Sequence, residues 1–238
     1  MPFLFALLFA WLGFYPPPVP QTPDNPTSIF LPMVQYVSPA VYYTGEGTYY
    51  DATGDGNCMF GPSPQDLMVG AMNQADYNHA ALCGAYVEVT GPKGMVTVRI
   101  VDRCPECAPG DIDFSPQAFS KIAELVQGRV PIRWRIVSPD LTGPITYRFK
   151  EGSNIWWTAV QIRNHRNPIA SVEYLDSGGN FQLMPRTDYN YFLEAKGLGP
   201  GPYTFRVTDI YGNVLQDAGI PFIIATEIPG SGQFPPMP

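Results

Sequence analysis

The sequence predicts a mainly β protein built from two β domains. Segments in which apolar and polar residues alternate recur along the chain, as is typical of strands with one buried face. Clusters of Gly, Pro, Asn and Asp separate these segments and supply the turns between strands. Aromatic residues make up 13% of the 238 residues, a composition that favours β-structure and flat stacking surfaces.

The first 39 residues are expected to precede both domains. Residues 3–11 form an almost unbroken apolar run with the length of a secretory h-region, although no positive residue comes before it. The run is too short to span a bilayer comfortably. We expect a signal peptide or an apolar, proline-rich lead at residues 1–22 and an extended linker at 23–39. An uncleaved anchor and a misassigned start are the alternatives.

The first domain is predicted at residues 40–138. Residues 85–89 and 95–101 alternate around a Gly-Pro-Lys-Gly turn and predict a hairpin, and residues 132–136 predict a further strand. One helix is expected, because Ser115 can cap it and Pro116 suits its first turn. Apolar residues at helical spacing follow, so the helix is expected to end at Gly128.

The second domain is predicted at residues 139–226, after a boundary rich in turn residues at 137–144. Short strands are expected there, and this spacing is typical of a β-sandwich. The predicted strands cover residues 145–149, 158–163, 171–175, 203–208 and 221–225. Residues 227–238 are expected to form a loose tail.

The charge balance excludes one class of partner. Charged residues make up 15% of the chain, and the net charge is −7. A chain without a basic patch cannot neutralise phosphates, so nucleic acid is not expected as a partner. A neutral polymer or small ligand fits better.

The four cysteines are Cys58, Cys83, Cys104 and Cys107. An even number in an exported chain favours disulfides, and four cysteines allow three pairings. We favour Cys104 with Cys107, which share a loop, and therefore Cys58 with Cys83. A zinc site would need further ligands at suitable spacing, and a redox pair would open a helix, where Pro109 stands instead. No metal or cofactor is expected.

Four carboxylates lie on the Gly/Pro-rich stretch around the second cysteine pair: Asp102, Glu106, Asp111 and Asp113. Glycoside hydrolysis needs two carboxyl groups at a defined separation. Asp102 ends a strand and Asp113 precedes the helix, so both can reach one rim of a barrel, where Thr48 and Asp51 are further candidates. The plain alternative is that Asp113 assists the helix N-terminus and Asp102 caps a turn.

The second candidate site contains Trp156 and Trp157. Adjacent residues in a regular strand point to opposite faces, which predicts one core and one surface ring. A bulge or irregular lead-in would place both on one face, with Tyr189 and Tyr191 as candidates to extend the platform. Aligned rings bind sugar faces through apolar contact.

Eight motifs in this order resemble the expansins, specifically the microbial type, over residues 45–225. They are GEGTYY (45–50), NQADYN (73–78), GAYVEVTGPKG (84–94), VDRCPEC (101–107), DIDFSP (111–116), KEGSNIWW (150–157), VQIRNH (160–165) and DYNYF (188–192). The resemblance implies a six-stranded double-psi β-barrel similar to family-45 endoglucanases. It also implies an immunoglobulin-like β-sandwich similar to carbohydrate-binding module family 63, with an open groove across both domains.

The resemblance also assigns roles. Asp113 matches the essential acid of the family, Asp102 its supporting aspartate and Thr48 a polar residue of the groove. Trp156, Trp157 and Tyr189 match the binding platform, and Lys150 matches a flanking basic contact. The simplest bacterial members carry an aromatic residue where Cys104 stands and have no cysteines, so a ring contact at that position is in doubt.

The implied function is that of a secreted, monomeric, non-catalytic protein of the cell wall. It would bind cellulose and other wall polysaccharides such as xyloglucan, loosen plant-type walls without hydrolysis, and have no membrane partner after processing. The acidic charge should repel pectin. One alternative is a weak glycoside hydrolase or lytic transglycosylase in which Asp51, Asp55 or Glu106 serves as second carboxylate; another is a plain adhesion protein.

Overall fold

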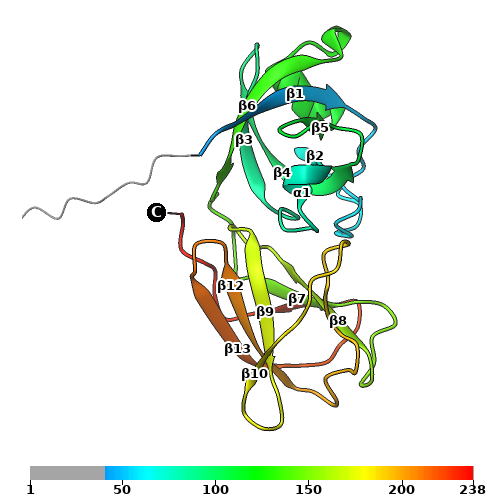
Figure 1. Ribbon diagram of the computed structural model, residues 1–238, viewed down its shortest axis with the longest axis vertical. Helices are drawn as coiled ribbons and strands as arrows, with labels where there is room; N and C mark the ends of the chain where they lie inside the picture. Colours follow the sequence, from blue (N-terminus) through cyan, green and yellow to red (C-terminus); the bar gives the residue numbers. More distant parts are fainter. Residues whose placement is uncertain (1–40, 238) are drawn as a thin grey trace, which may run out of the picture. The chain divides into compact units, whose positions relative to one another are not determined.

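The computed structural model describes residues 41–237, which form a β-barrel followed by a β-sandwich (Figure 1). The predicted signal peptide or lead and the predicted linker lie outside the described residues. Within residues 41–237, none of the helices has the length and apolar composition needed to cross a bilayer.

The barrel is closed by six strands in the order β1-β5-β2-β4-β3-β6. They are β1 (Tyr43–Tyr49), β2 (Val69–Asn73), β3 (Tyr86–Thr90), β4 (Met95–Cys104), β5 (Ile112–Phe114) and β6 (Val130–Val137). The pairs β1–β5 and β2–β4 are parallel, and the other four are antiparallel. This closed barrel confirms the predicted fold class, and β3 and β4 form the predicted hairpin.

Two short helices accompany the barrel. Helix α1 (Gln74–Tyr77) follows β2, and α2 (Pro116–Ile122) starts as predicted, with the Ser115 hydroxyl accepting the Ala118 N–H at 3.0 Å. The predicted helix end at Gly128 is wrong. The Lys93 N–H of the hairpin turn donates to the Ile122 carbonyl at 2.8 Å, and the backbone of Ala123 is already extended. A separate 3₁₀ turn, η1 (Leu125–Gln127), follows instead.

The sandwich consists of two antiparallel four-stranded sheets, β10-β9-β12-β13 and β11-β8-β7-β14. The strands are β7 (Thr146–Phe149), β8 (Thr158–Arg163), β9 (Ile169–Leu175), β10 (Phe181–Leu183), β11 (Phe192–Glu194), β12 (Tyr203–Asp209), β13 (Val214–Ile220) and β14 (Glu227–Pro229). Buried rings such as Phe149 and Phe205 fill the space between the sheets. The sandwich prediction is confirmed.

Two predictions for the end of the chain are wrong. Residues 221–225 form no strand and contribute only a bridge from Ile224 to Phe149, whereas the real strand β13 precedes them. The loose tail predicted at residues 227–238 is wrong for the described residues 227–237, because β14 pairs with β7 and Phe234 is buried in the sandwich core. The apolar residues of this stretch stand singly between prolines and glycines and show no periodicity in the sequence. Their burial in the core therefore could not be predicted from a pattern.

His165 follows β8 and is fully buried, with its Nδ1 2.8 Å from the Asn167 carbonyl oxygen. Burial lowers its pKa to about 4, and the charges of Arg186 and Arg99 act in the same direction. A histidine with a depressed folded pKa contributes stability above its unfolded pKa, and that contribution is lost as pH falls through the folded value.

We therefore expect the free energy of unfolding to fall by about 3 kcal/mol between pH 6.5 and pH 4 because of this residue. Urea titrations across this range measure the effect. The variant His165→Gln should flatten the pH dependence, whereas the exposed His79→Gln should keep it. A wild-type stability that stays constant over this range would contradict the prediction.

Candidate functional site

The strand pairing brings four residues side by side across four barrel strands: Thr48 of β1, Asp113 of β5, Ala71 of β2 and Asp102 of β4. We call this set the carboxyl row. Directly facing residues project to the same side of a sheet. Since Asp113 and Asp102 are two strands apart, their Cα atoms lie about 10 Å from each other.

A shift in the β2–β4 register aims Asp102 into the row. Gly70 faces Ile100, but the next residue of β2, Ala71, faces Asp102, so Val101 is passed over. One extra residue in a strand re-aims the side chains that follow it. Without the shift, Val101 would occupy the place opposite Ala71.

The row lies on the outer side of the barrel. Ile112 and Phe114 of β5 both belong to the barrel core, so Asp113 between them points the other way. Met72 of β2 is likewise a core residue, which turns the neighbouring Ala71 outward. Within the row, Ala71 is therefore the one residue between the two aspartates.

Asp113 accepts a hydrogen bond from Thr48, at 2.5 Å between Oγ1 and Oδ1. Burial raises the pKa of this carboxyl above its ordinary value, and the charges of Glu106 and Asp102 add to the rise. The Thr48 bond and the Arg129 charge oppose it without cancelling it. Asp113 therefore keeps a proton to higher pH than an exposed aspartate does.

Asp113 does not cap helix α2, which was the structural alternative for this residue. The helix cap is Ser115, and Asp113 turns instead toward Thr48 of another strand. Asp111 is the structural carboxylate of the stretch, because it accepts the Glu46 N–H at 2.7 Å and the Ala108 N–H at 3.1 Å. It fixes the loop that precedes β5.

Asp102 accepts hydrogen bonds from its surroundings. Its Oδ1 accepts the Asn57 N–H at 2.6 Å and the Arg103 N–H at 2.8 Å, and the Tyr50 hydroxyl lies 3.4 Å from Oδ2. Burial raises the pKa of Tyr50, which keeps this hydroxyl a donor. A Cβ at position 56 would lie 2.4 Å from Asp102 Cγ, so only glycine fits there.

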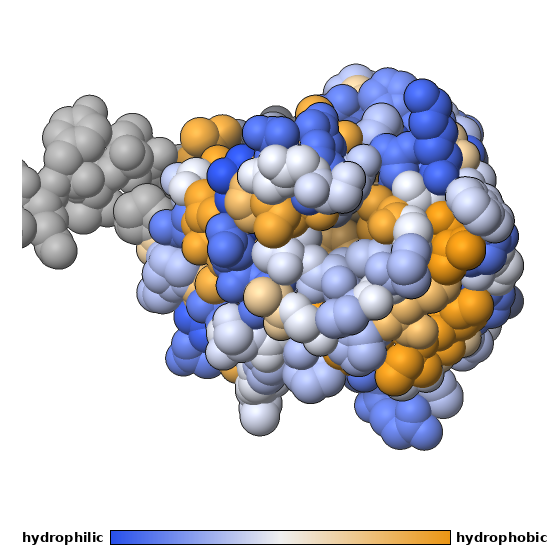
Figure 2. Space-filling view, turned by 90° about the horizontal axis from the view of Figure 1, so that it is seen from below, coloured by the Kyte–Doolittle hydropathy of each residue, from blue (hydrophilic) through white to orange (hydrophobic). Residues whose placement is uncertain are grey.

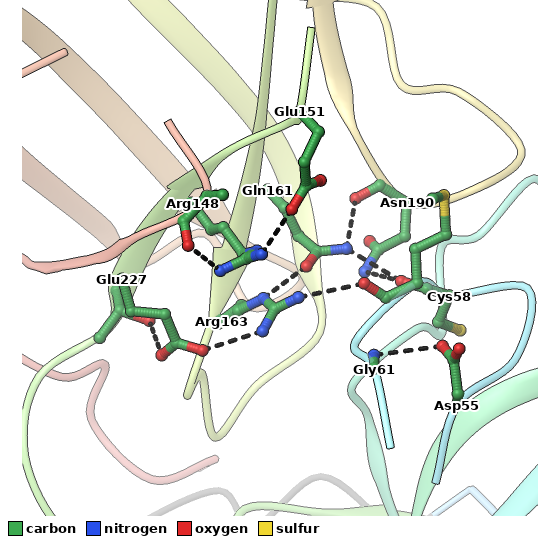
Figure 3. Close-up of polar contacts among 12 residues, drawn as sticks. Asp55, Cys58, Gly61, Arg148, Glu151, Gln161, Arg163, Asn190 and Glu227 are labelled. Carbon is green, nitrogen blue, oxygen red and sulfur yellow. Dashed lines mark hydrogen bonds and ion pairs between the residues drawn. The ribbon is translucent and has the colours of Figure 1, made fainter. Parts of the chain in front are cut away.

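The three alternative carboxylates differ in position. Asp55 holds a loop, since its Oδ1 accepts the Gly56 N–H at 3.0 Å and the Gly61 N–H at 3.1 Å. Figure 3 shows the bond to Gly61. Asp51 is exposed. Glu106 is exposed between Cys104 and Cys107, and its charge raises the pKa of Asp113. Glu106 is thus the one of the three that acts on the acid of the row.

Both predicted disulfides form, Cys58 with Cys83 and Cys104 with Cys107. The second closes the loop that joins β4 to β5, so it restrains the segment between Asp102 and Asp113. The first joins two loops near Asn57, a residue that the sequence did not single out. No group of three or more His, Cys, Asp or Glu suited to a metal ion occurs among residues 41–237.

The two tryptophans stand in a tight turn rather than in a strand. Asn154 and Trp157 pair through two backbone hydrogen bonds of 2.8 and 3.2 Å, and the Trp156 N–H reaches Asn154 Oδ1 at 2.9 Å. Strand β8 begins only after Trp157, so strand alternation does not govern the pair. Trp156 is 74% exposed, and Trp157 is partly exposed.

A second loop, which contains Gly197 and Gly199, packs against this turn. The Gly199 N–H donates to the Ile155 carbonyl at 3.1 Å, and a Cβ at Gly197 would lie 2.1 Å from the same oxygen. Gly197 also has a φ of +72°, which favours glycine. The exposed Trp156 is thus held on a well-packed base.

The remaining platform candidates differ in how exposed their side chains are. Tyr189 is partly exposed, but Tyr191 is only 2% exposed and packs its ring 6.0 Å from that of Tyr189, so Tyr191 does not extend a surface. Lys150 is partly exposed and donates its N–H to the Ala159 carbonyl of β8, two residues beyond Trp157. Figure 2 shows hydrophobic residues in separate patches on one face, with hydrophilic residues between them.

The fold and the candidate site define a class of two-domain proteins. In this class, a closed six-stranded double-psi barrel with a carboxyl row is followed by a β-sandwich with an exposed tryptophan turn. A family model described as lytic transglycolase matches residues 66–134, within the barrel. The chain is 43% identical to Expansin-YoaJ of Bacillus subtilis (strain 168) over 203 residues, which are 81% of this chain and 84% of that protein. The chain belongs to the expansin family.

Further relatives agree with this assignment. Expansin-like protein 2 of Dictyostelium discoideum is 33% identical over 187 residues, which cover 73% of this chain and 46% of that protein. The crystal structure of apo Clavibacter michiganensis expansin is 33% identical and superposes with a TM-score of 0.77, covering 83% of this chain and 100% of that one. A mutant Clavibacter michiganensis expansin in complex with cellohexaose matches with the same TM-score of 0.77 at 32% identity.

Proposed function

We propose that this chain is a secreted protein that binds cellulose and related neutral wall glucans and loosens plant-type cell walls without hydrolysing them. The observation that carries the proposal is the carboxyl row, which offers one protonatable acid, Asp113, beside an aspartate that is already engaged. Two relationships to known proteins support the polymer class: the family is that of the expansins, and a related expansin was crystallised with cellohexaose.

The proposed lack of hydrolysis follows from the state of Asp102. Cleavage of a glycosidic bond needs a general acid and a second carboxylate that is free to act on water or on the sugar. In this proposal Asp102, whose Oδ1 is held by two backbone N–H bonds and whose Oδ2 faces the Tyr50 hydroxyl, supports the row and does not serve as a base that activates water. Asp113 would hydrogen-bond or protonate a glucan oxygen, with Thr48 orienting it, and no second carboxylate of the row is proposed to act as a base.

The sandwich supplies affinity in this proposal. Trp156 and Trp157 would contact the apolar faces of successive sugars, with Tyr189 extending the platform and Lys150 as a flanking polar contact. Ring contacts of this kind contribute about 0.5–1.5 kcal/mol each, by analogy with aromatic pairs. A surface of several rings therefore binds a polymer well although each contact is weak.

Binding of the wild-type protein to insoluble polysaccharides tests the proposed polymer class. Amorphous cellulose and xyloglucan-coated cellulose should remove the protein from solution, whereas polygalacturonate should not, because the net charge of −7 is repelled by an anionic polymer. Raising the ionic strength screens charges, so it should leave cellulose binding unchanged. Protein that stays in solution with cellulose would contradict the proposal.

A weak glycoside hydrolase or lytic transglycosylase is the second candidate function. The match to the lytic transglycolase family model favours it, as does the charge of Glu106 acting on Asp113. Soluble oligosaccharides released from swollen cellulose or peptidoglycan by the wild type, and lost in Glu106→Gln, would establish this function instead.

A further inference from the structure

The geometry points to Asn57 and the Cys58–Cys83 disulfide as positioning elements that hold the carboxyl row and the Tyr189 loop in one fixed arrangement, so that a long glucan meets a single preorganised site. This inference rests on the proposed function. The barrel and the sandwich belong to one compact unit, Ser38–Pro238. Residues 57–59 and 77–84 of the barrel contact the sandwich. We call this set of contacts the domain joint.

Asn57 connects the two candidate sites directly. Its backbone N–H donates to Asp102 Oδ1 at 2.6 Å, and its side-chain Nδ2 donates to the Asp188 carbonyl at 2.7 Å. The Tyr77 hydroxyl, 2.7 Å from Asn57 Nδ2, donates to the same carbonyl, also at 2.7 Å. Asp188 directly precedes Tyr189, so one residue of the barrel fixes both the supporting aspartate and the backbone beside a platform ring.

The next two barrel residues accept hydrogen bonds from the sandwich (Figure 3). The Cys58 carbonyl accepts from Gln161 Nε2 at 2.9 Å and from Asn190 Nδ2 at 3.4 Å, and the Met59 carbonyl accepts from Arg163 Nη2 at 3.0 Å. Gln161 and Asn190 are buried, so leaving their amides without partners would be costly. Asn190 directly follows Tyr189, which is therefore held from both sides.

The Cys58–Cys83 disulfide links this segment to a second part of the joint. Near Cys83, His79 Nδ1 lies 2.7 Å from Asp188 Oδ1, and the Ala80 carbonyl accepts from Arg186 Nη1 at 2.9 Å. Gly84 packs so closely that a Cβ there would lie 2.6 Å from His165 Nε2. The crosslink thus ties together two barrel loops that both contact the sandwich.

A fixed joint changes how affinity depends on chain length. When two contact regions are held in place, a ligand that reaches both binds the second without a further loss of freedom. A ligand that reaches only one region gains nothing from the joint. Loosening the joint should therefore weaken binding of long oligosaccharides and leave binding of short ones unchanged.

Calorimetric titration with cellotriose and cellohexaose tests this on the full chain. The wild type should bind cellohexaose more tightly, and Asn57→Ala should lose about tenfold in hexaose affinity while triose affinity stays within about twofold. The double variant Cys58→Ser/Cys83→Ser should show the same pattern. Asn180→Ala, an exposed asparagine of the β9–β10 turn, is the matched control and should behave as wild type.

Residual dipolar couplings of the ligand-free proteins give a readout that is independent of binding. One alignment tensor should describe both domains in the wild type, whereas two are expected in Asn57→Ala. If that variant fails to fold, Gln161→Met removes the donor to Cys58 while keeping the side-chain length.

Equal losses for both oligosaccharides, or an unchanged hexaose affinity in a folded variant, would overturn the joint as a positioning device. A single tensor in every variant would do the same. Wild-type protein that binds neither oligosaccharide would instead contradict the proposed function, while the couplings would still report whether Asn57 fixes the domains.

Discussion

Replacing Trp156 and Trp157 together with alanine is expected to weaken binding to cellulose by about 10- to 100-fold. Each ring in contact with a sugar face contributes about 0.5–1.5 kcal/mol, and every 1.4 kcal/mol corresponds to about a factor of ten in affinity. Trp156 is 74% exposed at the tip of its turn, so its own loss should be mainly a loss of contact with the polymer. Trp157 is more covered and also supports the turn.

Binding isotherms on amorphous cellulose measure this effect. Leu183→Ala is the matched control, because Leu183 is a similarly exposed apolar side chain, at 65%, on the other sheet of the sandwich. The control should bind as wild type does. Unchanged affinity in the double tryptophan variant would show that the turn is not the main source of binding.

Replacing Asp113 with asparagine is expected to slow wall loosening at least about tenfold while leaving cellulose binding intact. The amide keeps an oxygen that accepts the Thr48 hydroxyl, so the barrel should fold as before. It cannot act as an acid, whereas burial and the charges of Glu106 and Asp102 raise the pKa of the Asp113 carboxyl. Loss of one hydrogen bond to a charged or acidic group is worth about 1.5–3 kcal/mol, so wall extension rates should fall at least about tenfold.

Creep rates of wall strips, measured beside cellulose binding, check this separation of roles. Asp140→Asn is the matched control, because Asp140 is a fully exposed aspartate in the segment that joins β6 to β7. An Asp113→Asn variant that retains all loosening activity would support a plain adhesion role and contradict the role proposed for the row.

Local patterns predicted those parts of the fold that local interactions determine. The β3–β4 hairpin and the Ser115 cap were visible because turn residues and a capping residue stand where the backbone needs them. Strand β2 was missed because all five of its residues are buried and it shows no alternation. The three-residue β5 was missed because its pairing with β1 joins residues 65 positions apart, as the Thr48–Asp113 bond shows.

The candidate site was predictable in its residue types but not in its geometry. Asp102 and Asp113 stood out as acids on a restrained loop, but the strand that separates them, and the register shift that aims Asp102, are tertiary features. Gly56 and Asn57 were not predicted as parts of the site, because nothing in the local sequence shows that Asp102 approaches them. The sequence does signal the tryptophan turn in part, through Gly152 and Asn154 just before it.

The most direct test of the account is a creep assay on heat-inactivated plant wall strips in which soluble sugars and new reducing ends are measured in the same bath. The wild-type protein is predicted to extend the strips while releasing no sugar, because Asp113 is the one acid proposed to act in the carboxyl row and Asp102 is proposed only to support it. Release of sugar in proportion to extension would contradict non-hydrolytic loosening, and strips that do not extend would contradict loosening itself.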